Sequence, residues 1–200
     1  MSGSLPRHVL LDRDGVLAVE RDGVTVTRAR DWEWIEGAVE ALRRLLTAGC
    51  RVGCATNQSV IGRGLTTTEE IDVLHRTVFD ALEGGVDALD FILYCPHAPE
   101  EGCACRKPEP GMLRTAAQRW GIDAGEIVFV GDAMSDLLAS RAAGLGFALV
   151  RTGKGEETEA ALRRAGGLAK LWGGRGYADL AEVVDELLRD AEVQHRSGPG

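Results

Sequence analysis

Val9–Leu17, with the sequence VLLDRDGVL, is the stretch that decides the fold of this 200-residue chain. Its apolar residues run directly into Asp12, and Asp14 and Gly15 follow at once. A short apolar run of this kind is typical of a strand inside a parallel sheet. Carboxylates at i and i+2 point the same way, and ligands of such sheets bind beyond the carboxyl ends of the strands. The stretch therefore predicts two acids in a functional crevice, unless Asp12 and Asp14 serve only as turn formers.

The rest of the chain alternates apolar runs with helical stripes, which predicts an α/β fold of parallel βαβ units. We expect a Rossmann-like three-layer sandwich with a central parallel sheet, formed as a single domain over residues 1–193 and followed by a disordered tail over 194–200. A short hairpin turning at Asp22-Gly23 is the only insertion near the first motif, which leaves no room for a large cap domain. Further strands are expected at 51–55, 89–94, 127–130 and 147–150, and helices at 36–48, 66–82, 111–120, 135–143, 156–165 and from about 180.

Composition and charge narrow the classes of partner. The net charge of −8 argues against general affinity for nucleic acids or anionic membranes. No apolar run approaches the roughly 20 residues of a membrane span, and the first residues, MSGSLPRH, lack the apolar core of a secretory signal. Five cysteines, three of them crowded between Cys95 and Cys105, favour a metal site in a reducing compartment over disulfides. We expect a cytoplasmic monomer.

Four polar clusters follow apolar strands and together contain the groups that phosphoryl transfer requires. Asp12 would attack phosphorus, while Asp14 would protonate the leaving oxygen and then deprotonate the attacking water. Asp12 and Asp132 would hold Mg²⁺, a hard cation that prefers oxygen ligands. The Thr56 hydroxyl would donate to the phosphoryl group, and Lys107 would neutralise its charge. This order of residue types predicts an enzyme with an aspartyl-phosphate intermediate.

These motifs resemble those of the haloacid dehalogenase-like phosphatase superfamily over roughly residues 8–155. The matching features are DxDG at Asp12, the strand-end Thr56, Lys107-Pro108 and the GDxxxD that contains Asp132. The resemblance implies a Rossmann-like core, dependence on Mg²⁺ and the roles given above. It also implies that the main-chain carbonyl of Asp14 binds Mg²⁺ and that Asp136 supports the metal shell or binds through water.

The finer pattern is similar to the heptose-1,7-bisphosphate 7-phosphatase branch, and histidinol-phosphate phosphatases share its Cys/His loop. The matching segments are LDRDGVL, TNQS, CPH with CRKP, and VRTGKG. The resemblance assigns structural zinc to Cys95, His97, Cys103 and Cys105. The chemistry agrees, because three thiolates and one imidazole close a tetrahedral zinc site and leave no open position. Zinc would then fix Arg106 and Lys107 at the mouth of the site.

Four features depart from the heptose pattern: Ala18, Val60, Ala133 and a shortened 97–103 segment. Ala133 removes a cation that could bind a second phosphate. The expected substrate-binding residues are Asn57, Arg63 and Arg106. Arg106 is the better candidate of the two arginines, because the alternative for Arg63 is a solvated loop charge. The resemblance implies removal of the 7-phosphate from D-glycero-D-manno-heptose 1,7-bisphosphate. Hydrolysis of histidinol phosphate or another small sugar phosphate is the enzymatic alternative, and a zinc-stabilised binding module is the non-enzymatic one.

Overall fold

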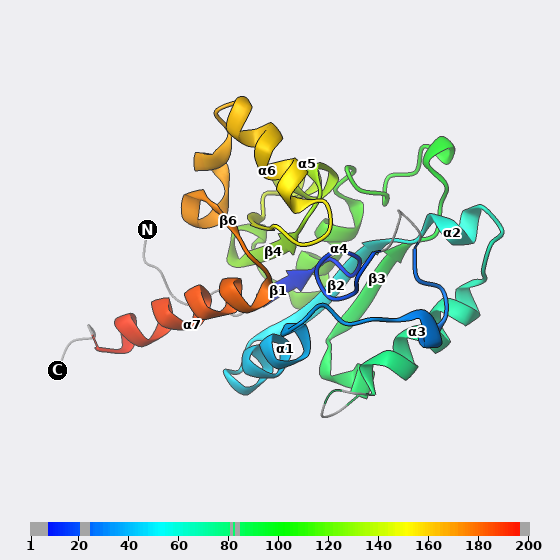
Figure 1. Cartoon of the computed structure of the whole chain (residues 1–200), viewed down its shortest axis with the longest axis horizontal. Coiled ribbons are helices and arrows are strands. Elements are labelled where there is room, and N and C mark those ends of the chain that lie inside the picture. Colours follow the sequence, from blue (N-terminus) through cyan, green and yellow to red (C-terminus); the bar gives the residue numbers. More distant parts are fainter. Residues whose placement is uncertain (1–7, 21–24, 81, 83–84, 197–200) are drawn as a thin grey trace.

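The computed structural model describes residues 8–20, 25–80, 82 and 85–196. Its centre is a parallel sheet of six strands in the order β3-β2-β1-β4-β5-β6 (Figure 1). The strands are β1 His8–Leu11, β2 Arg51–Asn57, β3 Phe91–Cys95, β4 Ile127–Gly131, β5 Gly146–Val150 and β6 Gly176–Tyr177. The strands β2 and β3 are added in turn on one side of β1, and β4, β5 and β6 are added in turn on its other side. The order reverses between β1 and β4, which is where open α/β sheets form their ligand crevice.

Helices cover both faces of the sheet, as the three-layer prediction requires. They are α1 Ala38–Thr47, α2 Ser59–Gly62, α3 Thr68–Phe79, α4 Gly111–Trp120, α5 Met134–Ala143, α6 Gly155–Arg164 and α7 Leu180–Arg196. One core contains buried residues of α1, α3 and α7 packed on the sheet, and the other contains residues of α4, α5 and α6. Figure 1 shows α7 and α6 on opposite sides of the sheet.

The β1 strand explains the two cores through side-chain alternation. Val9 and Leu11 belong to the core under α1, α3 and α7, whereas Leu10 belongs to the core under α4, α5 and α6. All three are fully buried, as expected for a central parallel strand covered on both faces. A continuous apolar run is therefore needed here, because an alternating strand would place polar groups in one core.

Several element ends differ from the sequence prediction. Helix α3 begins with the predicted capping box, in which the Glu70 N–H donates to Thr67 Oγ1 at 3.2 Å and the Thr67 N–H donates to Glu70 Oε2 at 3.0 Å. It ends at Phe79 rather than near residue 82. The α7 helix continues to Arg196, over the first three residues of the expected tail, and 197–200 lie outside the described residues. The short α2 and β6 were not predicted, because elements of four and two residues show no periodicity.

The segment after the first motif forms a ribbon beside the sheet. Leu17 O accepts a hydrogen bond from the Ile35 N–H, and the Val19 N–H donates to Glu33 O, both at 2.9 Å. The predicted turn at Asp22-Gly23 lies outside the described residues. Among the described residues, no helix combines the length and the apolar character that crossing a membrane would require.

Replacing Leu10 with alanine tests the position of the second core. We expect Leu10→Ala to lower the free energy of unfolding by about 3 kcal/mol, since it leaves a cavity at a fully buried site. Leu138→Ala is the matched control, because Leu138 is 46% exposed. Urea denaturation of the two variants provides the measurement. Equal losses for both would contradict the assignment of Leu10 to the core.

Candidate active site and metal-binding residues

The carboxyl ends of the strands bring the predicted site residues into one cleft of about 490 Å³. Asp12 follows β1, Thr56 and Asn57 end β2, and Asp132 follows β4. The cleft is lined by Asp12, Asp14, Glu20, Thr25, Thr56, Asn57, Ser59, Val60, Arg63, Leu65, Arg106, Lys107, Asp132, Ala133, Ser135, Asp136 and Lys154. Every catalytic, substrate-binding and magnesium residue predicted from the sequence thus borders the same space.

Lys107 is the centre of the charge arrangement. Its Nζ lies 2.8 Å from Asp12 Oδ2 and 2.8 Å from Asp136 Oδ1, and it donates to Ala55 O at 3.0 Å. Asn57 fixes the main chain of the lysine, because its Nδ2 donates to Lys107 O and its Oδ1 accepts from the Lys107 N–H, each at 3.0 Å. The ammonium therefore sits between two carboxylates that come from different segments.

Burial and charge shift the ionisation of this cluster. Burial raises the pKa of Asp12 well above its usual value, although Lys107 opposes that shift. Burial also raises the pKa of Asp132 to about 6, partly offset by the Lys154 N–H that donates to Asp132 Oδ2 at 2.7 Å. Burial alone would lower the pKa of Lys107, but Asp12 and Asp136 raise it above the ordinary value. The three carboxylates face one ammonium, so the cluster keeps excess negative charge.

The donor set of this cluster fits a hard divalent cation. One oxygen each of Asp12, Asp132 and Asp136 lie within 4.8 Å of one another, and all three residues are buried. Asp136 is already engaged by Lys107 at Oδ1 and by the Ala133 N–H at Oδ2, 3.0 Å away. Asp12 is engaged in the same way, by Lys107 at Oδ2 and by the Arg13 N–H at Oδ1, 2.7 Å away, so all three carboxylates are candidate ligands.

Two glycines make room for the Asp132 carboxylate. A Cβ on Gly15 would lie 2.2 Å from Asp132 Oδ2, and one on Gly153 would lie 2.1 Å from the same atom. Both glycines also have positive φ, which strains other residues. Thr152 Oγ1 donates to Gly15 O at 2.6 Å and ties the two loops together. Because neither glycine has a side chain, the Asp132 carboxylate fits between the loops that follow β1 and β5.

Asp14 is held by groups outside the Lys107 cluster. The guanidinium of Arg13 contacts both carboxylate oxygens, with Nη2 2.9 Å from each. Gln58 Nε2 donates to Asp14 Oδ2 at 3.0 Å and to Thr56 Oγ1 at 3.1 Å. The two acids of the first motif therefore have separate partners: Lys107 for Asp12, and Arg13 with Gln58 for Asp14.

The predicted zinc residues form a second cluster after β3. One donor atom each of Cys95, His97, Cys103 and Cys105 lie within 4.8 Å of one another. The Sγ atoms lie 3.3–3.5 Å apart, and His97 Nδ1 is 3.5 Å from Cys95 Sγ and 3.3 Å from Cys105 Sγ. Such spacings are close to the edges of a tetrahedron with metal–ligand bonds of about 2.0–2.3 Å. The donor set and its geometry therefore fit zinc.

Neighbouring glycines pack directly on this loop. The Gly111 N–H, at the start of α4, donates to Ala104 O at 3.1 Å, and a Cβ there would lie 2.3 Å from the same oxygen. The Gly62 N–H donates to Pro96 O at 2.7 Å. The loop is thus fixed between α2 and α4, next to Arg106 and Lys107.

Two arginines provide positive charge beyond the carboxylates. Arg63 is exposed and Arg106 is half-buried, and both line the cleft. Arg106 Nη1 donates to His97 O at 3.5 Å, and neither arginine has an acidic partner among the residues that the structure describes. Their charges are therefore available to an anionic ligand.

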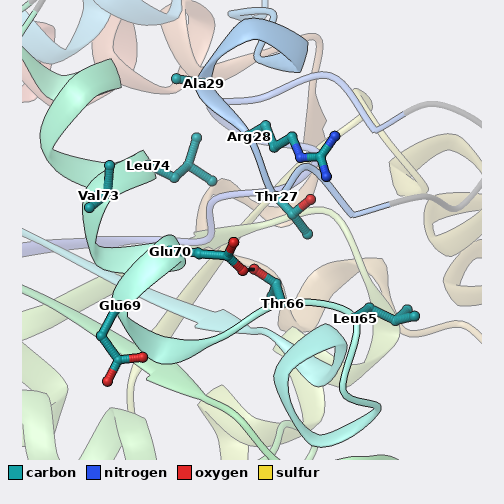
Figure 2. A pocket seen from close by; sticks show the side chains of 9 residues that line it. All are labelled: Thr27, Arg28, Ala29, Leu65, Thr66, Glu69, Glu70, Val73 and Leu74. Carbon is teal, nitrogen blue, oxygen red and sulfur yellow. Dashed lines mark hydrogen bonds between the residues drawn. The ribbon is translucent and has the colours of Figure 1, made fainter.

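A second cavity of about 370 Å³ lies beside the cleft and shares Leu65 with it. Figure 2 shows it between α3 and the segment 27–29, with Glu70 directed at Thr66, whose hydroxyl donates to Glu70 Oε2 at 2.8 Å. Its lining is mostly apolar or already paired, and the buried carboxylates and the lysine lie in the other space. We therefore place the chemistry in the larger cleft.

Sequence reasoning missed Arg13, Gln58, Glu20 and Lys154. Gln58 follows Thr56 by two residues and Lys154 follows the end of β5, so the strand-end rule could have found both. Arg13 lies between the two acids, at the position that the DxDG motif leaves unspecified. Lys154 Nζ pairs with Glu20 Oε2 at 2.8 Å across the mouth of the cleft. Two of the residues that differ from the heptose-phosphatase pattern have a structural role. The Ala133 N–H donates to Asp136, and the buried Ala18 forms an antiparallel β-bridge with Trp34.

Comparison with known proteins identifies relatives along nearly the whole chain. A family model described as HAD-hydrolase-like matches residues 104–169. The D-glycero-beta-D-manno-heptose-1,7-bisphosphate 7-phosphatase of Bordetella bronchiseptica is 40% identical over 183 residues, which are 92% of this chain and 98% of that protein. The Escherichia coli enzyme of the same name is 34% identical over 96% of this chain and all of its own length. A crystal structure of the Bordetella bronchiseptica heptose bisphosphate phosphatase with magnesium and phosphate superposes with a TM-score of 0.81, covering 92% of this chain and 99% of that one.

Removing the charge of Asp132 should stabilise the metal-free protein at alkaline pH. The folded-state pKa of about 6 exceeds the ordinary aspartate pKa of 3.8, so folded protein binds the proton more tightly and stability falls as pH rises through this interval. We expect Asp132→Asn, measured by urea denaturation with a chelator, to gain about 1–3 kcal/mol at pH 8 and about half as much at pH 5. Asp31→Asn, at an exposed acid, is the control. A variant less stable than the parent at pH 8 would contradict the argument.

Proposed function

Because the chain belongs to the family of the heptose-1,7-bisphosphate 7-phosphatases, within the haloacid dehalogenase-like phosphatases, we propose that it removes the 7-phosphate from D-glycero-D-manno-heptose 1,7-bisphosphate. The observation that carries the proposal is the convergence of Asp12, Lys107 and Asp132 in one cleft. Three segments far apart in the chain supply these groups, and a binding module would have no need of them together.

The reaction proceeds through an aspartyl-phosphate. A carboxylate oxygen of Asp12 forms a bond to phosphorus while the bond from phosphorus to the ester oxygen breaks, and Asp14 gives its proton to that leaving oxygen. Asp14 then takes a proton from water, whose oxygen attacks the phosphoryl group, and inorganic phosphate leaves as Asp12 regains its carboxylate. Thr56 donates its hydroxyl hydrogen to a phosphoryl oxygen, since Gln58 Nε2 already fills an acceptor position on Thr56 Oγ1.

We propose Mg²⁺ as the resident cation, held by the carboxylates of Asp12 and Asp132 and by the main-chain carbonyl of Asp14. When bound, Mg²⁺ supplies positive charge that offsets both the buried carboxylates and the phosphate. Asp136 acts by holding Lys107, whose ammonium in turn orients Asp12 and neutralises a phosphoryl oxygen. Asn57, with both ends of its amide on the backbone of Lys107, keeps that lysine in place beside its proposed contact with substrate.

Substrate selection rests on the arginines. Arg106 and Arg63 border the cleft and have no acidic partners among the described residues, so they can bind the phosphate that is not hydrolysed. A guanidinium pair disfavours the amino group of histidinol phosphate through like charge. The expected cytoplasmic location, monomeric state and absence of nucleic-acid partners remain predictions.

A phosphate-release assay with a substrate panel tests the function. The panel contains both anomers of the heptose bisphosphate, histidinol phosphate and p-nitrophenyl phosphate, each with and without Mg²⁺. We expect Mg²⁺-dependent release with a kcat/KM for a heptose bisphosphate at least about 100-fold above that for histidinol phosphate, which corresponds to about 2.7 kcal/mol. Asp12→Asn removes the nucleophile without changing side-chain size, so it should lose at least about 10⁴-fold in kcat.

Two outcomes of this panel would overturn the proposal. Preference for histidinol phosphate would replace the substrate, and absence of turnover for every ester with Mg²⁺ would favour a binding module. Retained activity in Asp12→Asn would refute the covalent route. Circular dichroism of that variant confirms that the fold is intact.

We also propose that zinc occupies the Cys/His cluster and has a structural role. Elemental analysis should find about one zinc per chain in the parent and none in Cys103→Ser. Cys103→Ser should also lower the midpoint of thermal unfolding by about 5–10 °C, because a loss of roughly 2–3 kcal/mol shifts a chain of this size by 2–4 °C per kcal/mol. Cys50→Ser, at a buried cysteine outside the cluster, should keep its zinc. A freshly purified parent without zinc would contradict this proposal.

A further inference from the structure

Arg13 lies between the two catalytic acids in sequence but does not line the cleft. Its side chain is fully buried, which is costly for a charged group unless every hydrogen-bond donor has a partner. Nε and Nη2 contact the Asp14 carboxylate, Nη2 also donates to Val26 O at 3.1 Å, and Nη1 lies 3.2 Å from His75 Nε2. The indole of Trp32 packs 5.7 Å from the guanidinium carbon. The whole environment of Arg13 is therefore arranged to present it to Asp14.

His75 completes this arrangement as a neutral acceptor. A guanidinium carries only donors, so His75 Nε2 must be unprotonated and the ring hydrogen must sit on Nδ1. Burial and the neighbouring Arg13 lower the pKa of His75 to about 3, which agrees with a neutral ring. His75 is 3% exposed and belongs to α3, which is remote from Arg13 in sequence. Its Nε2 accepts from Nη1, the one side-chain nitrogen of Arg13 that contacts neither Asp14 nor Val26.

Gln58 approaches Asp14 from the end of β2. It is fully buried, and its Nε2 makes both of its contacts, to Asp14 Oδ2 and to Thr56 Oγ1. Its Oε1 is buried without a hydrogen-bond partner in the structure. All of the hydrogen bonds that the Gln58 side chain makes in the structure therefore come from Nε2, and they go to Asp14 and Thr56.

We propose that Arg13, Gln58 and His75 are positioning residues that fix the carboxyl group of Asp14, the general acid and base of the function proposed above, on which this inference rests. Arg13 and Gln58 contact Asp14 directly, whereas His75 acts through Arg13. Both oxygens of the clamped carboxylate accept hydrogen bonds, which fixes the orientation in which the side chain takes a proton from water. Held in the same place, the protonated acid delivers that proton to the leaving oxygen.

The ratio of two kcat/KM values isolates this role. Cleavage of a sugar phosphate needs a proton on its alkoxide leaving group, whereas p-nitrophenolate leaves without one. We expect Gln58→Met to lower kcat/KM for the heptose bisphosphate by about 10- to 100-fold and that for p-nitrophenyl phosphate by less than about 3-fold. Loss of the Gln58 contact to Thr56 affects both substrates alike and cancels in the ratio. An unchanged ratio would overturn the proposal, while an inactive parent enzyme would instead refute the proposed function.

Three further variants separate positioning from folding, because substitution of the buried Arg13 itself can prevent folding. Gln118→Met makes the same chemical change at an exposed residue of α4 and should leave the ratio unchanged. Gln58→Met should lower the thermal midpoint by less than about 8 °C, since the loss of two Nε2 hydrogen bonds is partly offset by removal of the unpartnered Oε1. His75→Gln, which retains an acceptor for Arg13, should keep the ratio, and His75→Leu should lower it. Equal ratios in the two His75 variants would exclude His75 from the positioning set.

Discussion

The ammonium of Lys107, placed between the buried carboxylates of Asp12 and Asp136, is the interaction on which the site depends. Two carboxylates at this depth repel each other and are poorly solvated, so bringing them together without a cation is unfavourable. Lys107 lies 2.8 Å from each and thereby joins the end of β1 to the start of α5. Because the lysine enters from a loop after β3, three parts of the chain must be correctly folded before Asp12, the proposed nucleophile, has its partner.

The Cys/His cluster matters for the same reason. An aperiodic loop with several prolines has no backbone ladder of its own, yet it must deliver Lys107 to within hydrogen-bond distance of two carboxylates. Three features hold the loop: the four clustered Cys and His side chains, the amide of Asn57, and the close contact of Gly111 with Ala104. A structural metal at Cys95, His97, Cys103 and Cys105 would thus act on catalysis without touching the substrate, by fixing the residues that follow it.

The first motif divides its two acids between two electrostatic environments. Asp12 shares Lys107 with Asp136 and lies near Asp132, where a divalent cation is needed to balance the charge. Asp14 has a separate partner in Arg13 and a donor in Gln58. Chemically identical side chains two residues apart can therefore take different roles, one as nucleophile and the other as acid and base, because their surroundings differ.

The sequence alone determined the parallel α/β fold and placed the predicted carboxylates, hydroxyl and lysine at the cleft, but it missed Glu20 and Lys154, which also line that space. Continuous apolar runs have no other stable place than a sheet covered on both faces, and the carboxyl ends of such strands share one edge. Asp12, Thr56, Lys107 and Asp132 were predicted for this reason. The Cys/His set was predicted from the crowding of three cysteines and from the family resemblance. Only the tertiary structure decided what each polar group binds: Asn57 faces the backbone of Lys107, Asp136 the lysine itself, and His75 the buried Arg13. Those contacts join residues up to 62 positions apart, and local periodicity carries no information about which distant donor meets which acceptor.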